Sequence, residues 1–195
     1  MKKLLLMTAV AVFGFSNVNA QDENTTGGFE KGDVYVSGTV GYNSTKEGDF
    51  KTNRFDFMPT VGYFVSENIA LEANLIIGSS EDADDDKTST FGAGLGATYF
   101  FTPASQFSFT VGAGVAYTNA KFEPNGGTET KVNAFAIAVA PGLNYFVSDC
   151  FALRASIGAL SYASAKPDVD GAESANAFGL NLDLSDINFG VTYKF

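Results

Sequence analysis

The chain contains no histidine, no tryptophan and a single cysteine, Cys150. One cysteine cannot form a disulfide within the chain, so the fold must be held together without one. Histidine is the side chain whose ordinary pKa suits a general base near neutral pH, and many hydrolases use it to activate a serine. We therefore expect no enzyme activity, no catalytic residue and no cofactor, and we interpret Cys150 as a turn residue.

Long apolar runs and positive charge are also scarce. After the N-terminal segment there is no stretch of about 18 apolar residues, which excludes a membrane-spanning helix, and helical periodicity is absent. The formal net charge is −10, and it becomes more negative if Lys2 and Lys3 are removed by processing. Nucleic acid is not an expected partner, because phosphate binding requires a basic surface.

The N-terminal segment has the organisation of a secretory signal. Lys2 and Lys3 precede a short apolar run at residues 4–15, and Val18-Asn19-Ala20 supplies a cleavage site. We expect residues 1–20 to be a cleaved signal peptide, residues 21–32 to be a mobile periplasmic lead, and residues 33–195 to form one domain.

Within that domain, large apolar residues alternate with small or polar ones, which is the period of a β-strand. The expected strands lie at residues 34–42, 55–65, 69–77, 91–101, 107–117, 135–147 and 151–157, with an eighth ending at Phe195. One face of each strand is bulky and often aromatic. The opposite face carries Gly, Ala, Ser, Thr or Asn, as at Gly92, Gly94 and Gly96.

The distribution of bulk between the two faces decides the fold class. A soluble barrel places its large apolar residues inside, but here the small and polar face is the one suited to a narrow interior. The bulky face would be a very large exposed patch in water, whereas lipid would cover it, and a closed barrel pairs every backbone group as a bilayer requires. We predict an all-β fold: an eight-stranded antiparallel up-and-down transmembrane β-barrel.

The connections between the expected strands alternate in length. Three are short (66–68, 102–106 and 148–150), and four are longer and polar (44–52, 79–87, 121–130 and 164–176). Outer-membrane barrels have short periplasmic turns and longer external loops, so both termini should lie on the periplasmic side.

One region breaks the alternation. Phe178, Leu180, Leu182 and Leu184 are even-numbered, whereas the apolar residues from Ile187 onward are odd-numbered. Either a β-bulge or a turn at residues 185–186 would explain the change of parity. We favour one long, bulged eighth strand, because a ninth strand would leave Phe195 on the wrong side.

Aromatic residues mark the expected membrane boundary. Four outward tyrosines lie near the periplasmic ends of strands and predict an aromatic girdle: Tyr63, Tyr99, Tyr145 and Tyr193. Three inward phenylalanines near the same ends could close the lumen: Phe64, Phe100 and Phe146.

With its signal segment, its alternating strands and the ending "INFGVTYKF", the sequence resembles the small outer-membrane β-barrel proteins of the OmpA/OmpX-type superfamily, in the Gly-rich and Phe-rich style of Bacteroidetes barrel-domain proteins. The resemblance implies a Gram-negative cell outer membrane as location. It implies as partners outer-membrane lipid and lipopolysaccharide, with periplasmic chaperones and the barrel assembly machinery during biogenesis, for a monomeric protein. Alternate residues of the last strand are similar to the signal that this machinery reads: Phe189, Val191, Tyr193 and Phe195.

A repeated segment predicts a lumenal ion pair. "YFVSENIALEA" begins at Tyr63 and "YFVSDCFALRA" begins at Tyr145, and the two differ in charge at Glu72 and Arg154. The strands that follow the two turns stand four apart in a ring of eight, so both side chains should point inward from opposite walls at equal height. Pairing would offset the cost of burying two charges, and we expect Arg54 and Asp56 to extend the network.

The acidic run at residues 81–86 is the one candidate for a metal site. Its carboxylates could ligate calcium, and the weak candidates are Asp82, Asp84, Asp85 and Asp86. The spacing of a dedicated calcium loop is absent, so a solvated external loop is the favoured interpretation and no metal is expected.

Three functions follow from this architecture. We favour an integral outer-membrane protein with a structural or surface role, because eight strands leave a lumen that side chains fill. The glycine and alanine lining keeps open a porin-like alternative, a narrow pore or carrier for small solutes, including hydrophobic ones. Adhesion or recognition through the external loops is the third possibility.

Overall fold

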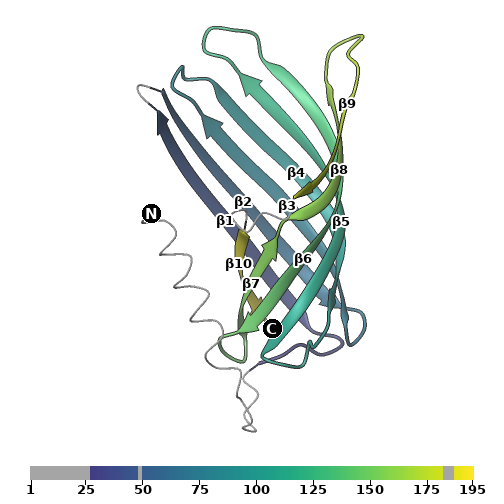
Figure 1. Cartoon of the computed structure of the whole chain (residues 1–195). Helices are drawn as coiled ribbons and strands as arrows, with labels where there is room; N and C mark the ends of the chain where they lie inside the picture. Colours follow the sequence, from purple (N-terminus) through teal and green to yellow (C-terminus); the bar gives the residue numbers. More distant parts are fainter. Residues whose placement is uncertain (1–26, 48–49, 182–186) are drawn as a thin grey trace.

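A computed structural model describes residues 27–47, 50–181 and 187–195, so the expected signal peptide lies outside the described residues (Figure 1). The described chain consists of strands and short connections. The strands are β1 (Val34–Glu47), β2 (Phe50–Phe64), β3 (Ile69–Glu81), β4 (Lys87–Phe100), β5 (Phe107–Glu123), β6 (Thr130–Phe146), β7 (Phe151–Ile157), β8 (Ala159–Pro167), β9 (Ala175–Asn181) and β10 (Ile187–Lys194). Among the described residues, no helix is long and apolar enough to cross a membrane.

The strands close into a barrel, as the sequence predicts. It has eight antiparallel positions around the ring, each formed by one or two strands and here called a stave. β1 to β6 pair in sequence order, β7 follows β6, and β10 pairs with both β7 and β1 to complete the ring. β8 and β9 continue the wall above β7 and β10. Figure 1 shows the short turns and the C-terminus at one end of the barrel, here called the turn end, and the long hairpins at the other, the loop end.

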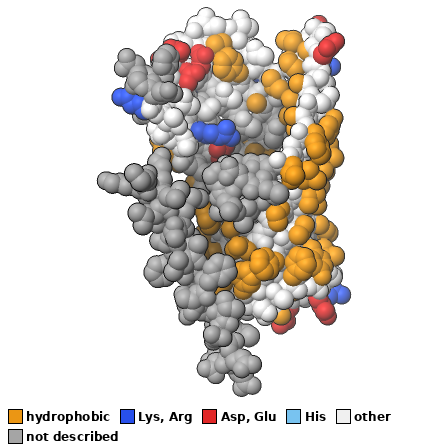
Figure 2. Space-filling model, in the orientation of Figure 1, with side chains coloured by type: hydrophobic (Ala, Val, Ile, Leu, Met, Phe, Trp, Pro, Cys, Tyr) orange, Lys and Arg blue, Asp and Glu red, His pale blue; other side chains and the backbone are white. Residues whose placement is uncertain are grey.

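The two faces of the wall differ as expected. Outward side chains such as Leu95 and Phe109 are 65% and 62% exposed, whereas large inward side chains near the turn end are fully buried. The alternation is regular along each strand, as in β3 and β5. Figure 2 shows hydrophobic side chains gathered on the outer wall, with acidic and basic groups at its two ends. Such a surface requires lipid around it.

The strands at the loop end run further than polarity alone predicts. Residues 44–47, expected in a loop, pair with residues 50–53 of β2, and the expected loop at 121–130 is shortened to residues 124–129 because residues 121–123 and Thr130 are strand. The connections at this end are reduced to residues 48–49, 82–86, 124–129 and 168–174. The loops at this end are therefore shorter than expected, because polar residues above the membrane continue the backbone ladder as extended hairpins.

The seventh stave is interrupted at Gly158, which has a positive φ of 63°. β6 pairs with β7 up to Gly142↔Ser156 and resumes with β8 at Val139↔Leu160. β7–β8 therefore has one more residue than β6 between these pairs, which is a β-bulge. Above the bulge the exposed apolar residues of this stave are even-numbered, as at Leu160 and Tyr162.

The eighth stave is also two segments. Among the described residues, β9 pairs with β8 alone, and β10 pairs with β7 and β1. The single long bulged strand that we favoured stays a prediction, because Leu182, Leu184 and the parity change at 185–186 lie outside the described residues. The apolar residues that are described do keep the expected parity, with Phe178 and Leu180 exposed on β9.

The described residues leave a seam in the upper wall, between β1 and β9. β1 pairs with β10 only from Tyr35↔Lys194 to Thr39↔Gly190. Within the described ranges, the edge of β1 above Thr39 and the free edge of β9 have no strand partner. Figure 1 shows β1 and β9 on opposite sides of the upper barrel.

Candidate functional site: the lumen and its plug

An aromatic plug closes the lumen at the turn end. It consists of five fully buried rings: Phe29, Tyr35, Phe64, Phe100 and Phe146. Phe29 stands at the centre, with ring centroids 4.7 Å from Phe64 and 4.9 Å from Phe146. These stacked and edge-to-face contacts have the spacing that aromatic pairs prefer. The three phenylalanines expected to close the lumen all belong to this plug.

Phe29 comes from the segment that we expected to be a mobile lead, and for residues 27–32 that expectation is wrong. Phe29 N–H donates to Pro103 O at 2.8 Å, and Gly32 N–H donates to Phe64 O at 2.9 Å. Lys194 Nζ, from the last strand, donates to Gly28 O at 2.6 Å. The segment is therefore fastened to a turn, to β2 and to β10.

Glycines make this close packing possible. Gly27 has a φ of 76°, and a Cβ there would lie 2.4 Å from Phe146 Cδ1. A Cβ on Gly62 would lie 2.1 Å from Tyr35 Cζ. No side chain fits at either position, since carbon atoms do not approach this closely.

A polar layer lies against the plug. Arg154 NH1 stands 2.7 Å from Glu72 Oε1, and both side chains are less than a fifth exposed. Glu72 also accepts hydrogen bonds from the Tyr35 hydroxyl and from Thr98 Oγ1, the latter at 2.8 Å. The structure thus brings together, from β3 and β7, the two side chains whose contact the repeat predicts.

The guanidinium has a second set of contacts. Arg154 Cζ lies 5.6 Å from the ring centroids of both Tyr35 and Phe100. At this distance the faces of aromatic rings attract a cation. Arg154 therefore joins the aromatic plug to the polar layer, and the two form one closed unit.

Arg54 and Asp56 do not extend this network. They pair with each other, with Arg54 Nε 2.7 Å from Asp56 Oδ2, in an exposed position higher in the barrel. Asp56 lies opposite Gly78 of β3. Gly78 is about 20 Å along the strand from Glu72, at roughly 3.3 Å per residue. The expected extension is wrong, because the Arg54–Asp56 pair on β2 lies too far along the barrel to reach Glu72 and Arg154.

Above the polar layer lies a lumenal cavity of about 200 Å³. Its floor includes Glu72, Thr98 and Arg154. Its walls carry hydroxyl groups and one long apolar side chain: Ser37, Thr39, Thr60, Thr110, Ser156 and Met58. At about 30 Å³ per molecule, it has room for roughly seven waters or one small organic group.

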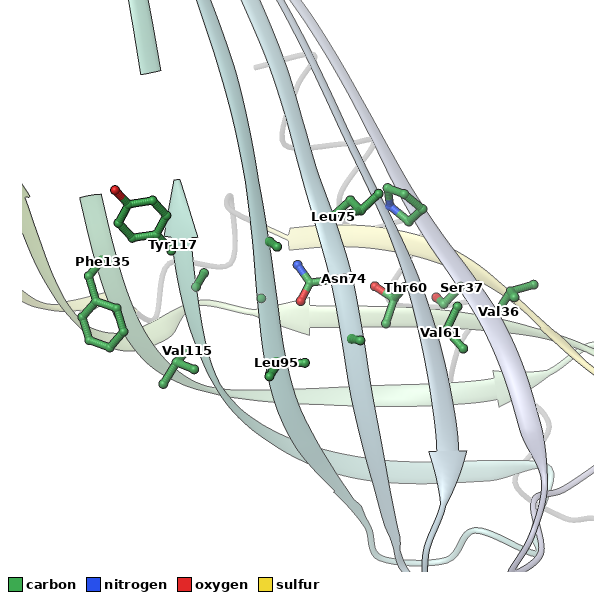
Figure 3. A pocket seen from close by; sticks show the side chains of 15 residues that line it. Val36, Ser37, Thr60, Val61, Asn74, Leu75, Leu95, Val115, Tyr117 and Phe135 are labelled. Atoms are coloured by element: carbon green, nitrogen blue, oxygen red, sulfur yellow. The ribbon is translucent and has the colours of Figure 1, made fainter. Parts of the chain in front are cut away.

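A larger depression of about 710 Å³ crosses the mid-height of the wall formed by β1 to β6 (Figure 3). Its larger lining residues belong to the exposed outward set, for example Leu95 and Tyr117. Small residues such as Ala73 and Ala93 lie between them. Because this face needs lipid, acyl chains are sufficient to fill the depression, and we assign it no separate ligand.

The acidic run forms a tight turn between β3 and β4. The Asp82 carboxylate accepts hydrogen bonds from Asp84 N–H and Asp86 N–H at 3.0 and 3.1 Å, and Asp85 has a positive φ of 61°. Asp86 Oδ1 accepts from Asn125 N–H at 2.8 Å. Across the described residues, no group of three acidic, histidine or cysteine side chains is placed to hold a metal ion.

The boundary tyrosines lie on the outer face near the turn end. Tyr63, Tyr99 and Tyr145 are exposed, and Tyr193 is half-buried between Phe151 and Phe195, with both ring centroids 5.0 Å away. Phenylalanines join the same level, as in the contact of Tyr99 with Phe101. On β10, Phe189 and Val191 are exposed on the lipid side, as is the terminal Phe195. Cys150 is exposed in the β6–β7 turn.

The closed ring, the apolar exterior and the polar interior together define a transmembrane β-barrel. The chain belongs to the family described as "Outer membrane protein beta-barrel domain", whose model matches residues 8–195. This family indicates the outer membrane as the location. In such barrels the short turns face the periplasm, so the turn end is the periplasmic end.

Solved structures agree on the fold. Neisserial surface protein A matches with 18% identity and a TM-score of 0.55, over 83% of this chain and 97% of that chain. OprG from Pseudomonas aeruginosa matches with 15% identity and a TM-score of 0.55, over 86% and 98%. The N-terminal barrel domain of OprF from the same organism matches with 18% identity and a TM-score of 0.52, over 86% and 100%. A comparison with curated protein sequences finds no match.

Three members of the site escaped the sequence reasoning. Phe29 is the one aromatic residue in an otherwise polar, glycine-rich segment, which was the available signal. Tyr35 alternates with Val34 and Val36 and so had to point inward. No comparable signal marks Thr98, because it is one of many inward threonines.

Proposed function

We propose that the protein is a structural or surface component of the outer membrane whose lumen is sealed at the periplasmic end. The observation that carries the proposal is the plug itself: five buried rings beneath a paired Glu72 and Arg154. A solute that crossed to the periplasm would have to displace both layers. The protein would then act through its outer wall and its external hairpins, with no enzymatic reaction in the lumen.

The outer surface is suited to this role. The apolar wall binds lipid, and the hairpins carry acidic groups such as Glu81 and Asp82 above it. Lipopolysaccharide would surround the barrel at this level, and divalent cations could link its phosphates to the carboxylates. The same proposal has four further parts. The protein is a monomer, it binds no nucleic acid, its signal peptide is cleaved after residue 20, and the assembly machinery reads Phe189 to Phe195.

Conductance across a planar bilayer tests the seal. We expect the wild-type protein to show no stable conductance steps. We expect the double variant Phe29→Ala/Phe146→Ala to show steps, because it removes two of the five rings at the centre of the plug. The matched control is Phe107→Ala/Phe109→Ala, which removes two exposed rings from the outer wall and should stay silent. Stable steps in the wild-type protein would defeat the proposal and favour the pore.

A further inference from the structure

Three lysines gather on the outer wall near the loop end. Here called the lysine patch, they are Lys121 of β5, Lys131 of β6 and Lys166 of β8. Lys121 lies directly opposite Lys131, and Lys166 lies opposite Asn133, two residues along β6 from Lys131. Long side chains at these spacings on one face of a sheet can reach one another. The chain has 22 acidic and 12 basic residues, so its composition does not explain three neighbouring lysines.

The lysine patch stands above the apolar part of the wall. On these three strands the outward aromatic residues nearest the loop end are Tyr117, Phe135 and Tyr162, and each is four residues from the lysine of its own strand. The register between the strands is unbroken over these residues, so ring and lysine lie on the same outward face. Aromatic rings mark the boundary between hydrocarbon and head groups in such barrels. The lysine patch therefore lies at the level of the head groups of the outer leaflet.

An amide pair lies between the rings and the lysines. Asn119 Nδ2 donates to Asn133 Oδ1 at 2.8 Å, and both side chains are half-buried. Asn133 stands opposite Lys166 and on the same strand as Lys131. Within the described ranges, Asn133 Nδ2 donates no hydrogen bond to another residue. Its two N–H groups are therefore available to a polar head group that lies between Lys131 and Lys166.

A carboxylate of the chain itself shows that these lysines can hold an anion. Glu129 Oε2 lies 2.8 Å from Lys121 Nζ, and Glu129 Oε1 lies 3.4 Å from Lys131 Nζ, so one anion bridges two ammonium groups. Lys121 Nζ is also 2.6 Å from Glu123 Oε1. Without such a bridge, two like charges directly opposite each other would destabilise the sheet. Lys121 is thus compensated within its own hairpin, whereas Lys131 has one longer contact with a shared carboxylate.

Lys166 has a positive charge that the hairpins do not compensate. Its side chain is exposed, and it forms no ion pair with any residue that the structure describes. Asp168 follows on the same strand position, and its N–H donates to Lys131 O at 2.8 Å, but its carboxylate pairs with neither lysine. Lys131, Lys166 and Asn133 Nδ2 therefore offer two cations and an amide donor to an anion from outside the chain. A phosphate, with three acceptor oxygens and up to two negative charges, matches this set.

We propose that Lys131, Lys166 and Asn133 bind the phosphate group of a phosphorylated glycolipid of the outer leaflet, with its acyl chains against Phe135 and Tyr162. The sugar would lie on the amide pair, whose polar atoms can hydrogen-bond its hydroxyl groups. Here the lysines contact the phosphate directly, without a divalent cation. The proposal rests on the outer-membrane surface role proposed above but not on the sealed lumen, because conductance tests the seal and lipid binding tests this site.

Lipid binding in detergent solution tests the site. The folded protein is titrated with diphosphoryl lipid A, and native mass spectrometry counts the lipids bound. EDTA is present, so that no divalent cation can link a phosphate to the carboxylates of the hairpins. We expect Lys131→Gln/Lys166→Gln to weaken binding of the first lipid by about tenfold, because two charge-assisted hydrogen bonds to the phosphate are lost.

The matched control is Lys46→Gln/Lys87→Gln. It removes the same charge from two exposed lysines of β1 and β4, outside the lysine patch, and should change the affinity by less than about twofold. Phosphatidylglycerol, which carries a phosphate but no sugar, should bind the wild-type protein about tenfold more weakly than lipid A does. Inorganic phosphate at the concentration of the lipid should not displace it. Unheated gel mobility confirms that each variant is folded.

Four results would overturn the proposal. Equal weakening by the two double variants would show that affinity follows net charge alone. Equally tight binding of phosphatidylglycerol would remove the sugar from the site, and displacement of lipid A by inorganic phosphate would make it a site for the free ion. Absence of lipid A binding by the wild-type protein would defeat the site and leave the seal untouched. Conductance steps in a wild-type protein that binds lipid A would defeat the seal alone.

Discussion

At the periplasmic end, five aromatic rings and an ion pair fill the lumen, whereas at the external end the described residues of β1 and β9 are not paired with each other. The lower half buries its polar groups and must satisfy them internally. The upper half leaves its charges, such as Arg54 and Asp56, in contact with solvent. The same eight staves therefore support a packed core at one end and an open, hydrated vestibule at the other.

This difference indicates which part of a small barrel contributes most to its stability. An eight-stranded barrel has a lumen narrow enough for side chains to fill, but only part of this one is filled. Substitutions in the filled part should destabilise the protein by kilocalories, and similar substitutions in the open part should be nearly silent. Matched pairs of variants, one from each half, measure that contrast.

Removing one partner of each ion pair should give the largest contrast. Arg154→Met leaves the Glu72 carboxylate buried without its cation, and we expect the free energy of unfolding to fall by about 3–5 kcal/mol. Arg54→Met breaks the exposed pair with Asp56 and should cost less than about 1 kcal/mol. Urea titration in lipid vesicles, followed by circular dichroism, measures both. Equal losses would show that the buried pair contributes no more to the free energy of unfolding than the exposed pair does.

The charge-reversed protein sharpens the same test. Glu72→Arg alone should be as damaging as Arg154→Glu alone, and the double variant should recover part of the loss. Recovery should be incomplete, because Tyr35 and Thr98 donate hydrogen bonds to a carboxylate on β3 and would face a guanidinium instead. No recovery at all would contradict a stabilising contact between the two positions.

A methyl group placed against the plug should have a smaller effect. Gly62→Ala drives a Cβ into the Tyr35 ring and should destabilise the protein by about 1–3 kcal/mol, the usual range for overpacking. Gly38→Ala is the control, since its Cβ would meet only Phe57 Cε2 at an ordinary 3.7 Å. If the two unfolding midpoints coincide, the plug is looser than its contacts indicate.

The junction between the two halves should be sensitive to backbone conformation. Gly158→Ala puts a side chain at a φ of 63° and should destabilise the protein by about 1–2 kcal/mol. Gly179→Ala in β9 has no such conformation and has only Ser161 Oγ nearby, at 3.9 Å. The same urea titration compares them, and a harmless Gly158→Ala would mean that the bulge does not require glycine.

The smallest effect should come from the external hairpins. The hydrogen bond from Lys121 lowers the pKa of Glu129, so whatever stability this carboxylate contributes is present above its ordinary pKa and is lost as the pH falls through the lowered value. Both groups are solvent-exposed, and Glu129→Gln should leave the unfolding midpoint unchanged at neutral pH. A midpoint shift as large as that of Gly62→Ala would show that the hairpin is coupled to the barrel.

Prediction from sequence succeeded where one residue's position follows from its neighbours. Alternation placed Phe64, Phe100 and Phe146 inward, and the repeat placed Glu72 and Arg154 at one height on opposite walls. Both inferences need only the two-residue period of a strand and the order of strands in a ring. The parity change before Ile187 was visible for the same reason, but its partner at Gly158 was overlooked.

Prediction failed where the outcome depends on contacts between distant segments. Polar residues 44–47 were assigned to a loop, although a strand above the membrane is polar too. Residues 27–32 were assigned to a mobile lead, because their composition is that of a flexible segment and nothing local shows that Phe29 has a pocket waiting for it. Such a pocket exists only after four other aromatic rings have been brought together.

The amino-acid sequence by itself determined that this protein is a transmembrane barrel with a polar interior. Bulky apolar residues alternate with small or polar ones along each strand, so the bulky face must lie outside, where only lipid can cover it. Only the tertiary structure decided how the lumen is used. Closure of the ring brings Phe29, Tyr35 and Arg154 together at the periplasmic end. At the other end, the bulge at Gly158 shifts the register of the seventh strand position, and the described residues of β9 pair with β8 and not with β1. Plug and seam both arise from register and closure, which are properties of the whole sheet and not of any single strand.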